Sequence, residues 1–167
     1  MAPSPQTIII RHRRERLSKC SLRGLEGRPD LNFVTFPHDP PPSLAGHLYL
    51  SLNGPPLVPA DTERPLCLVD ATWRLARRVE NAWAGHLQQA EPRTLPAGLT
   101  TAYPRQQTAC PDPQRGLASI EALYVARFIL GQPVNHLLDG YRWAGPFLER
   151  NADVLNRLRP QASRPPA

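Results

Sequence analysis

The chain has 167 residues, the size of one ordinary domain, and 41% of them are hydrophobic, which is enough to build a core. Its 20 Lys and Arg residues outnumber its 14 Asp and Glu residues, so the net charge is +6 and we expect the surface to attract anions. The 21 prolines exclude a coiled coil or a long helical bundle, and because no apolar run approaches the roughly 20 residues that span a bilayer, we expect a soluble protein with no membrane partner.

The first half of the chain has the pattern of short strands separated by proline-rich turns. The predicted strands are residues 7–11, 31–36, 47–52 and 66–70. Residues 66–69 form a continuous apolar run, which is typical of a strand buried on both faces of a largely parallel sheet. The two ends, residues 1–5 and 160–167, are rich in proline and poor in apolar residues, so we expect them to be disordered.

The second half of the chain has the period of helices. Apolar residues recur at helical spacing over residues 72–89, 119–131 and 143–157, and Pro92 ends the first of these predicted helices. Residues 99–103 are predicted to form a further strand. Strands followed by helices, with a buried apolar strand leading into a helix, indicate an α/β fold that binds ligands at the carboxyl ends of its strands.

The common motifs of several enzyme classes are absent. The sequence has no G-x-x-x-x-G-K-[ST], no G-x-G-x-x-G and no G-x-S-x-G, which disfavours P-loop nucleotide hydrolysis, common dinucleotide binding and serine hydrolase chemistry. Cys20, Cys67 and Cys110 are odd in number, and neither they nor the histidines have the spacing of metal ligands. We therefore expect reduced thiols in a cytoplasmic protein and no bound metal.

The most informative stretch is Asp70-Ala71-Thr72-Trp73, where the buried strand turns into a helix. Two interpretations of these residues are open from their position alone. Asp70 could cap the helix while Trp73 belongs to the core. Alternatively, Asp70 could accept or orient a proton while the Trp73 ring forms a wall for a flat or cationic ligand.

Blocks of residues along the chain match, in order, the motifs of one enzyme family. They are Lys19-Cys20-Ser21, Tyr49-Leu50-Ser51, Pro59-Ala60-Asp61, Asp70-Ala71-Thr72-Trp73, Arg93 with Leu95 and Pro96, Leu117-Ala118-Ser119-Ile120-Glu121-Ala122, and Tyr141-Arg142-Trp143-Ala144-Gly145-Pro146-Phe147. The chain thereby resembles the small-subunit ribosomal RNA aminocarboxypropyltransferases and, more distantly, the DTW-domain enzymes that make the same modification on transfer RNA. The match spans about residues 18–158.

The resemblance implies a SPOUT-like α/β fold with a largely parallel sheet, helices on both faces and a C-terminal trefoil knot. One domain would cover residues 6–158, with a small β-rich part at 6–60 and a part at 61–158 that binds S-adenosylmethionine (SAM). The implied reaction moves the 3-amino-3-carboxypropyl group of SAM to N3 of a uridine or pseudouridine in small-subunit rRNA and releases methylthioadenosine. Because that leaving group is neutral, the reaction requires no metal.

The resemblance also assigns roles to individual residues. Ser21, Val69, Leu95 and Ser119 match residues of the family that contact the cofactor, and Trp73 matches a tryptophan beside the methionine moiety. Asp70 matches the acid near the reacting end. It would act as the catalytic base that removes the N3 proton, or as an electrostatic orienter toward the sulfonium or the amino group.

Basic residues near the N-terminus predict an RNA partner, either rRNA or a pre-ribosomal particle. Those residues are Arg11, Arg13, Arg14, Arg16, Lys19, Arg23 and Arg28, and the predicted helix at 72–89 adds Arg74, Arg77 and Arg78. Three alternatives remain open from the sequence: a transfer RNA substrate, methyl transfer by a SPOUT enzyme, and a non-catalytic RNA-binding protein of ribosome assembly. We expect a monomer.

Overall fold

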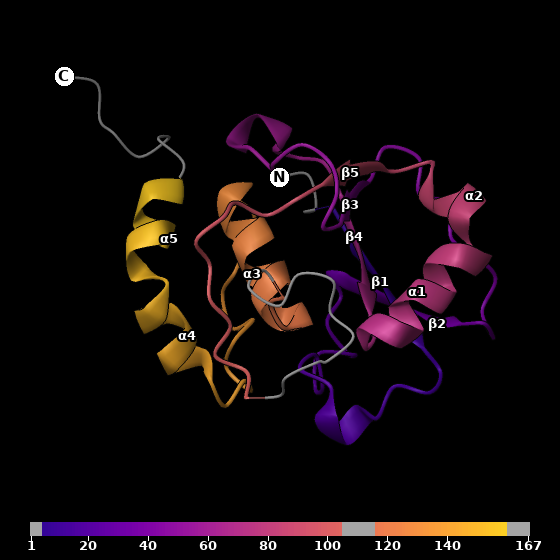
Figure 1. Cartoon of the computed structure of the whole chain (residues 1–167), viewed down its shortest axis with the longest axis horizontal. Coiled ribbons are helices and arrows are strands. Elements are labelled where there is room, and N and C mark those ends of the chain that lie inside the picture. Colours follow the sequence, from indigo (N-terminus) through magenta and orange to yellow (C-terminus); the bar gives the residue numbers. More distant parts are fainter. Residues whose placement is uncertain (1–4, 105–115, 160–167) are drawn as a thin grey trace.

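The fold is a five-stranded sheet with helices on both sides (Figure 1). The computed structural model describes residues 5–104 and 116–159, so the predicted disordered ends lie outside the described residues except for Pro5. The strands are β1 (Thr7–His12), β2 (Leu31–Phe36), β3 (Leu48–Leu50), β4 (Leu66–Asp70) and β5 (Glu91–Arg93). Their order is β2-β1-β4-β3-β5 and every neighbouring pair is parallel, which confirms the predicted parallel sheet.

β4 lies in the middle of the sheet, between β1 and β3. Leu66 and Cys67 are fully buried and Leu68 is 4% exposed, as expected for a strand covered on both faces. The last residue of β4, Asp70, pairs in register with Arg11 of β1. The carboxyl ends of these neighbouring strands therefore lie side by side at one edge of the sheet.

Helices cover the two faces of the sheet as separate layers (Figure 1). The helices are α1 (Trp73–Ala82), α2 (Ala84–Leu87), α3 (Ser119–Ile129), α4 (Ala144–Arg150) and α5 (Ala152–Leu158), and two 3₁₀ turns occupy Leu17–Lys19 and Pro59–Asp61. Cys67 packs in one core cluster with residues of α1 and α2, whereas Leu66 and Leu68 pack in the other with residues of α3, α4 and α5. Because successive side chains of β4 point to opposite faces of the sheet, this strand contributes to both core clusters.

Two predicted helices are each divided in the structure. The prediction of one helix over residues 72–89 is wrong because the backbone leaves helical geometry at Trp83, whose ring is buried and packs edge-on against Phe36 at 5.0 Å between centroids. The helix predicted at 143–157 is likewise divided at Asn151. The Asn151 side chain is fully buried and forms hydrogen bonds with both the N–H and the carbonyl of Thr100.

One strand was predicted in the wrong place. Residues 99–103 are irregular, because their polar groups bond to side chains of α3 and of Asn151 instead of a neighbouring strand. The strand that forms the sheet edge beside β3 is β5, which is only three residues long and contains Pro92. A proline is tolerated there because an edge strand has one side that needs no ladder hydrogen bond.

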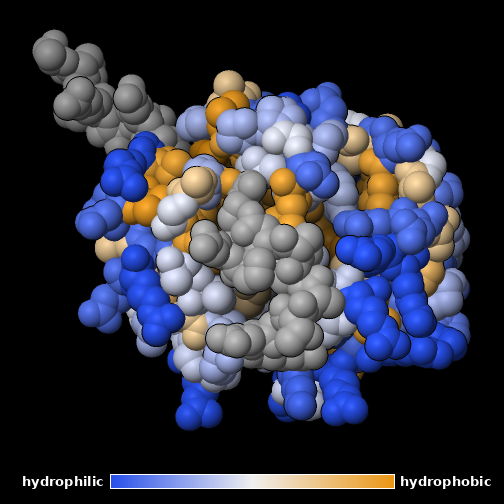
Figure 2. Space-filling model, in the orientation of Figure 1, coloured by the Kyte–Doolittle hydropathy of each residue, from blue (hydrophilic) through white to orange (hydrophobic). Residues whose placement is uncertain are grey.

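Hydrophilic side chains are unevenly distributed over the surface. Figure 2 shows hydrophilic side chains gathered over the side of the molecule where α1 lies. Exposed basic residues on α1 and in the segment after β1 contribute to it: Arg13, Arg14, Arg16, Lys19, Arg23, Arg74, Arg77 and Arg78. Burial lowers the pKa of His12, and the charges of Arg14, Arg78 and Arg13 lower it further, so guanidinium groups from both segments surround this histidine.

Candidate functional site

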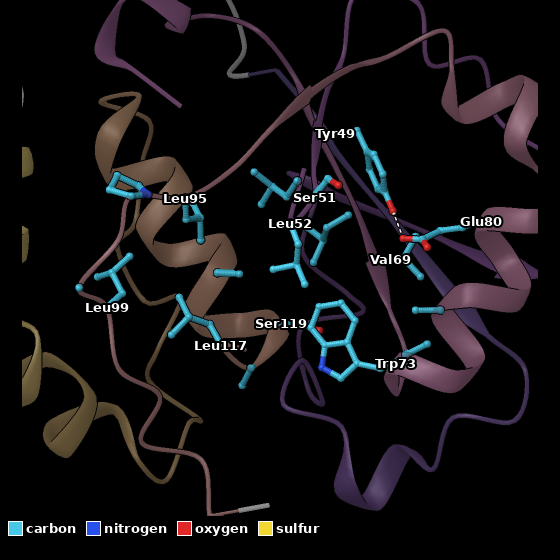
Figure 3. A pocket seen from close by; sticks show the side chains of 18 residues that line it. Tyr49, Ser51, Leu52, Val69, Trp73, Glu80, Leu95, Leu99, Leu117 and Ser119 are labelled. Carbon is cyan, nitrogen blue, oxygen red and sulfur yellow. Dashed lines mark hydrogen bonds between the residues drawn. The ribbon is translucent and has the colours of Figure 1, made fainter. Parts of the chain in front are cut away.

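A pocket lies at the carboxyl ends of β3 and β4, between α1 and the start of α3 (Figure 3). Its lining is mostly apolar, with a few hydroxyl groups and one carboxylate. The lining residues come from five segments: Tyr49, Leu50, Ser51 and Leu52; Leu68, Val69 and Ala71; Trp73, Ala76 and Glu80; Leu95, Pro96, Gly98 and Leu99; Leu117, Ala118, Ser119 and Ala122. An apolar cavity with few polar groups is the usual form of a small-molecule site.

One wall of the pocket is a single face of α1. Trp73, Ala76 and Glu80 lie three and four residues apart, which places them on one face of the helix. The Trp73 ring lies in the pocket, and the Tyr49 hydroxyl donates a 2.7 Å hydrogen bond to Glu80 Oε1 (Figure 3). Burial, followed by the Glu80 carboxylate, raises the pKa of Tyr49, so this hydroxyl stays protonated and donates at neutral pH.

The opposite wall consists of two irregular segments held by one buried carboxylate, that of Glu121. Its oxygens accept hydrogen bonds from Thr101 Oγ1 at 2.7 Å, Ala102 N at 3.0 Å and Ala118 N at 2.9 Å. The Tyr141 hydroxyl donates a fourth bond at 2.8 Å. Glu121 therefore ties the residues that follow the pocket residue Leu99 to Ala118, which lines the pocket just before α3.

Four of the five predicted cofactor-binding residues lie together. Val69, Trp73, Leu95 and Ser119 all line the pocket. Ser21 is absent from the lining; instead its hydroxyl accepts a 3.2 Å hydrogen bond from the backbone N–H of Ile120. It thereby supports the first turn of α3 from behind, next to Ser119.

Asp70 also lies outside the pocket lining and is itself buried, in a cluster of charged and polar side chains. Its Oδ2 accepts hydrogen bonds from Arg11 Nε and from Cys20 Sγ, each at 3.0 Å, and Arg11 also pairs with Glu26 at 3.1 Å. Burial and the neighbouring Asp70 charge raise the pKa of Cys20 to about 12, so this sulfur remains a thiol and donates to Asp70. We call these four residues the Arg11–Asp70 cluster.

Of the two interpretations of Asp70, the capping one is wrong. The Thr72 N–H at the start of α1 donates to the Glu15 carboxylate at 3.1 Å, and the Asp70 carboxylate is bonded to Arg11 and Cys20 instead. The catalytic interpretation stays a prediction. Trp73 is half-buried and forms pocket wall, which favours the ligand-facing interpretation of this residue.

Sequence reasoning missed the polar pair of the pocket, Tyr49 and Glu80. Tyr49 belongs to a recognised block but received no role, and Glu80 was in none of the blocks. The available signal was the spacing of Glu80 from Trp73, because residues seven apart on a helix share a face. Their contact joins residues 31 apart in sequence and is visible only in three dimensions.

The described residues contain no membrane-spanning helix and no cluster of metal-ligating side chains. None of the helices there has the length and apolar character needed to cross a membrane. Likewise, no group of three or more His, Cys, Asp or Glu side chains in residues 5–104 and 116–159 is arranged to hold a metal ion.

Fold and pocket together define a class: an all-parallel α/β protein with a largely apolar pocket at the carboxyl ends of its strands, where such sheets bind ligands. Within it, the chain is similar to the solved structure of the SAM-dependent rRNA:acp-transferase Tsr3 from Vulcanisaeta distributa. The similarity covers 93% of this chain and 83% of that one, with a TM-score of 0.71 and 26% sequence identity. No family model matches the sequence, and no curated protein does.

Proposed function

We propose that this protein transfers the 3-amino-3-carboxypropyl group of SAM to N3 of a uridine or pseudouridine in small-subunit rRNA and releases methylthioadenosine. The observation that carries the proposal is the meeting of Val69, Trp73, Leu95 and Ser119 in one pocket, within a fold similar to Tsr3. These residues come from four different segments, and three of them, Trp73, Leu95 and Ser119, belong to blocks of the sequence that resemble the family motifs.

The pocket offers groups that suit SAM. Apolar side chains such as Leu95 and Leu117 are suitable walls for the adenine, and the Trp73 ring suits the cationic methionine portion. A sulfonium carries three alkyl substituents that can each be attacked in line, so the product depends on which carbon the pocket turns toward the nucleophile. In this proposal the shape of the pocket selects the aminocarboxypropyl carbon and shields the methyl.

Asp70 has a positioning role in this proposal. A general base must come within hydrogen-bond reach of the proton it removes, whereas the Asp70 carboxylate is bonded to Arg11 and Cys20. Ser21, which follows Cys20 in the chain, contacts the first turn of α3 beside Ser119. Asp70 thus supports the pocket through Cys20 and Ser21, whereas direct base catalysis would make loss of Asp70 abolish activity without a loss of stability.

The rRNA partner is proposed from charge and from the activity of Tsr3. Exposed arginines on α1, beginning next to Trp73, and in the segment after β1 provide contacts for phosphate groups. Several finer expectations stay predictions: the SPOUT-like class with its trefoil knot, the relation to DTW-domain enzymes, the cytoplasmic location and the monomeric state. A solution mass of twice 18.6 kDa would contradict the last of these.

The test is identification of the small-molecule product by mass spectrometry after mixing protein, SAM and undermodified small-subunit rRNA. We expect methylthioadenosine together with a matching mass gain on a uridine-type nucleotide. S-adenosylhomocysteine would instead make the protein a methyltransferase. Modification of transfer RNA alone would change the substrate, and tight SAM binding without any product on either RNA would favour a non-catalytic role.

A further inference from the structure

Three acidic residues at or near the pocket differ in how their negative charge is balanced. Asp70 is paired with the Arg11 guanidinium, and Glu121 is saturated by four hydrogen-bond donors in the buried core. Glu80 accepts only the Tyr49 hydroxyl bond, and no Lys or Arg among the residues that the structure describes forms an ion pair with it. Of the three, Glu80 alone lines the pocket.

The position of Glu80 suits a cationic ligand group. It lies on the same face of α1 as Trp73, so a carboxylate and an aromatic ring share one wall (Figure 3). Both groups attract cations, the carboxylate by direct charge and the ring by its negative face. The Tyr49 hydroxyl uses part of one carboxylate oxygen and fixes its direction, which leaves the other oxygen for a ligand.

We propose that Glu80, held by Tyr49, recognises the positive charge of the sulfonium in SAM, so that the pocket prefers a cationic ligand to its neutral thioether counterpart. This inference rests on the proposed function, since Glu80 would recognise the charge of the substrate in that same pocket. Glu80 is a specificity-determining residue here and takes no part in proton transfer.

The preference has a consequence for turnover. In the proposed reaction uridine N3 gives up its proton to solvent water and forms a bond to the terminal carbon of the aminocarboxypropyl group, while the carbon–sulfur bond breaks and its electron pair stays on sulfur. The sulfonium becomes the neutral thioether of methylthioadenosine. The attraction to Glu80 is lost in the same step, which favours exchange of the product for new SAM.

The experiment is isothermal titration of wild-type protein and variants with SAM, with S-adenosylhomocysteine and with sinefungin, in which an ammonium-bearing carbon replaces the sulfur. Glu80→Gln should weaken SAM and sinefungin binding about fivefold, the size expected for a partly exposed charge pair, and leave S-adenosylhomocysteine within about twofold. Tyr49→Phe should weaken SAM binding about twofold, because the carboxylate remains but loses its fixed direction.

Glu149→Gln is the matched control, because Glu149 is an exposed acid on α4 outside the pocket and its substitution changes the net charge equally. Equal weakening of SAM and S-adenosylhomocysteine by Glu80→Gln, no weakening of either, or the same effect from Glu149→Gln would overturn the inference. If the wild type still forms methylthioadenosine in that case, the proposed function stands without it. Failure of the wild type to bind any of the three ligands would overturn both.

Discussion

The end of β4 borders two regions that use acidic residues in opposite ways. In the Arg11–Asp70 cluster, Asp70 is 4% exposed and already has a guanidinium and a thiol as partners. In the pocket, Glu80 is itself exposed, and its one hydrogen-bond partner within residues 5–104 and 116–159 is the Tyr49 hydroxyl. An acid within a recognisable motif can thus be bonded to buried partners, while an acid outside every such motif lines the pocket.

The strand geometry explains why the two regions can be so close in sequence and yet distinct. Val69 and Asp70 are consecutive residues of β4, so their side chains leave the strand on opposite faces. Val69 lines the pocket, while Asp70 meets Arg11 from the paired strand β1. Changes in the cluster should therefore act first on stability, and changes in the pocket first on ligand affinity.

The largest expected effect comes from breaking the Arg11–Asp70 cluster. Asp70→Ala removes the buried ion-pair partner of Arg11 and leaves the guanidinium only its pairing with the more exposed Glu26, so we expect a loss of about 3 kcal/mol in the free energy of unfolding, measured by urea denaturation. The double variant Arg11→Met with Asp70→Leu removes both charges and should recover most of that loss. If both variants are as stable as the wild type and still lack activity, Asp70 acts in catalysis and the positioning role is wrong.

The second effect concerns the buried carboxylate that joins the two irregular pocket segments. Glu121→Gln places an amide NH₂ among groups that all donate, so we expect about 2 kcal/mol of destabilisation and weaker SAM binding. Tyr141→Phe removes only one of the four donors and should cost about 1 kcal/mol in the same urea experiment. An unchanged stability of Glu121→Gln would show that the segments are held by other contacts.

The third expected effect is on ligand affinity and comes from the pocket alone. Trp73→Ala removes an aromatic wall from a half-buried site, and we expect SAM affinity to fall about tenfold by calorimetry while the melting temperature changes little. Trp73→Phe keeps an aromatic face and should restore part of the affinity. Loss of stability without loss of SAM affinity would place Trp73 with the core and not with the ligand.

The smallest effect is expected on the basic face. Arg77→Gln and Arg78→Gln should each weaken rRNA binding a few-fold and reduce its dependence on salt, by about one unit of log–log slope per lost phosphate contact. Arg157→Gln, an equally exposed substitution on α5, serves as the control. An identical salt dependence for all three variants would show that the RNA-binding surface does not include α1.

Much of the sheet could be predicted from the sequence, because its central strands have strong local signals. The apolar run at residues 66–69 predicted the buried strand β4, and the β2 segment at 31–36 has the bounds expected. β5 could not be predicted, since three residues with a central proline have no strand pattern of their own and pair only because β3 lies beside them. The helix divisions at Trp83 and Asn151 likewise depend on distant partners.

The candidate site was predicted in part for a related reason. Val69, Trp73, Leu95 and Ser119 were found because a family resemblance assigned them, and the fold then brings them to one pocket. The residue that balances the charge of Asp70 could not be predicted from the sequence. Arg11, which was expected to contact RNA, lies 59 residues from Asp70 in the chain and is buried against it. Pairings of this kind are set by the strand order and not by spacing in the sequence.

The most direct test of the central claim is label transfer from two SAM preparations to small-subunit rRNA, one labelled in the carboxyl group and the other in the methyl group. We predict that rRNA gains the carboxyl label and none of the methyl label, and that Trp73→Ala lowers this incorporation. Incorporation of the methyl label would contradict the claim, because the pocket would then present the methyl carbon to the nucleophile.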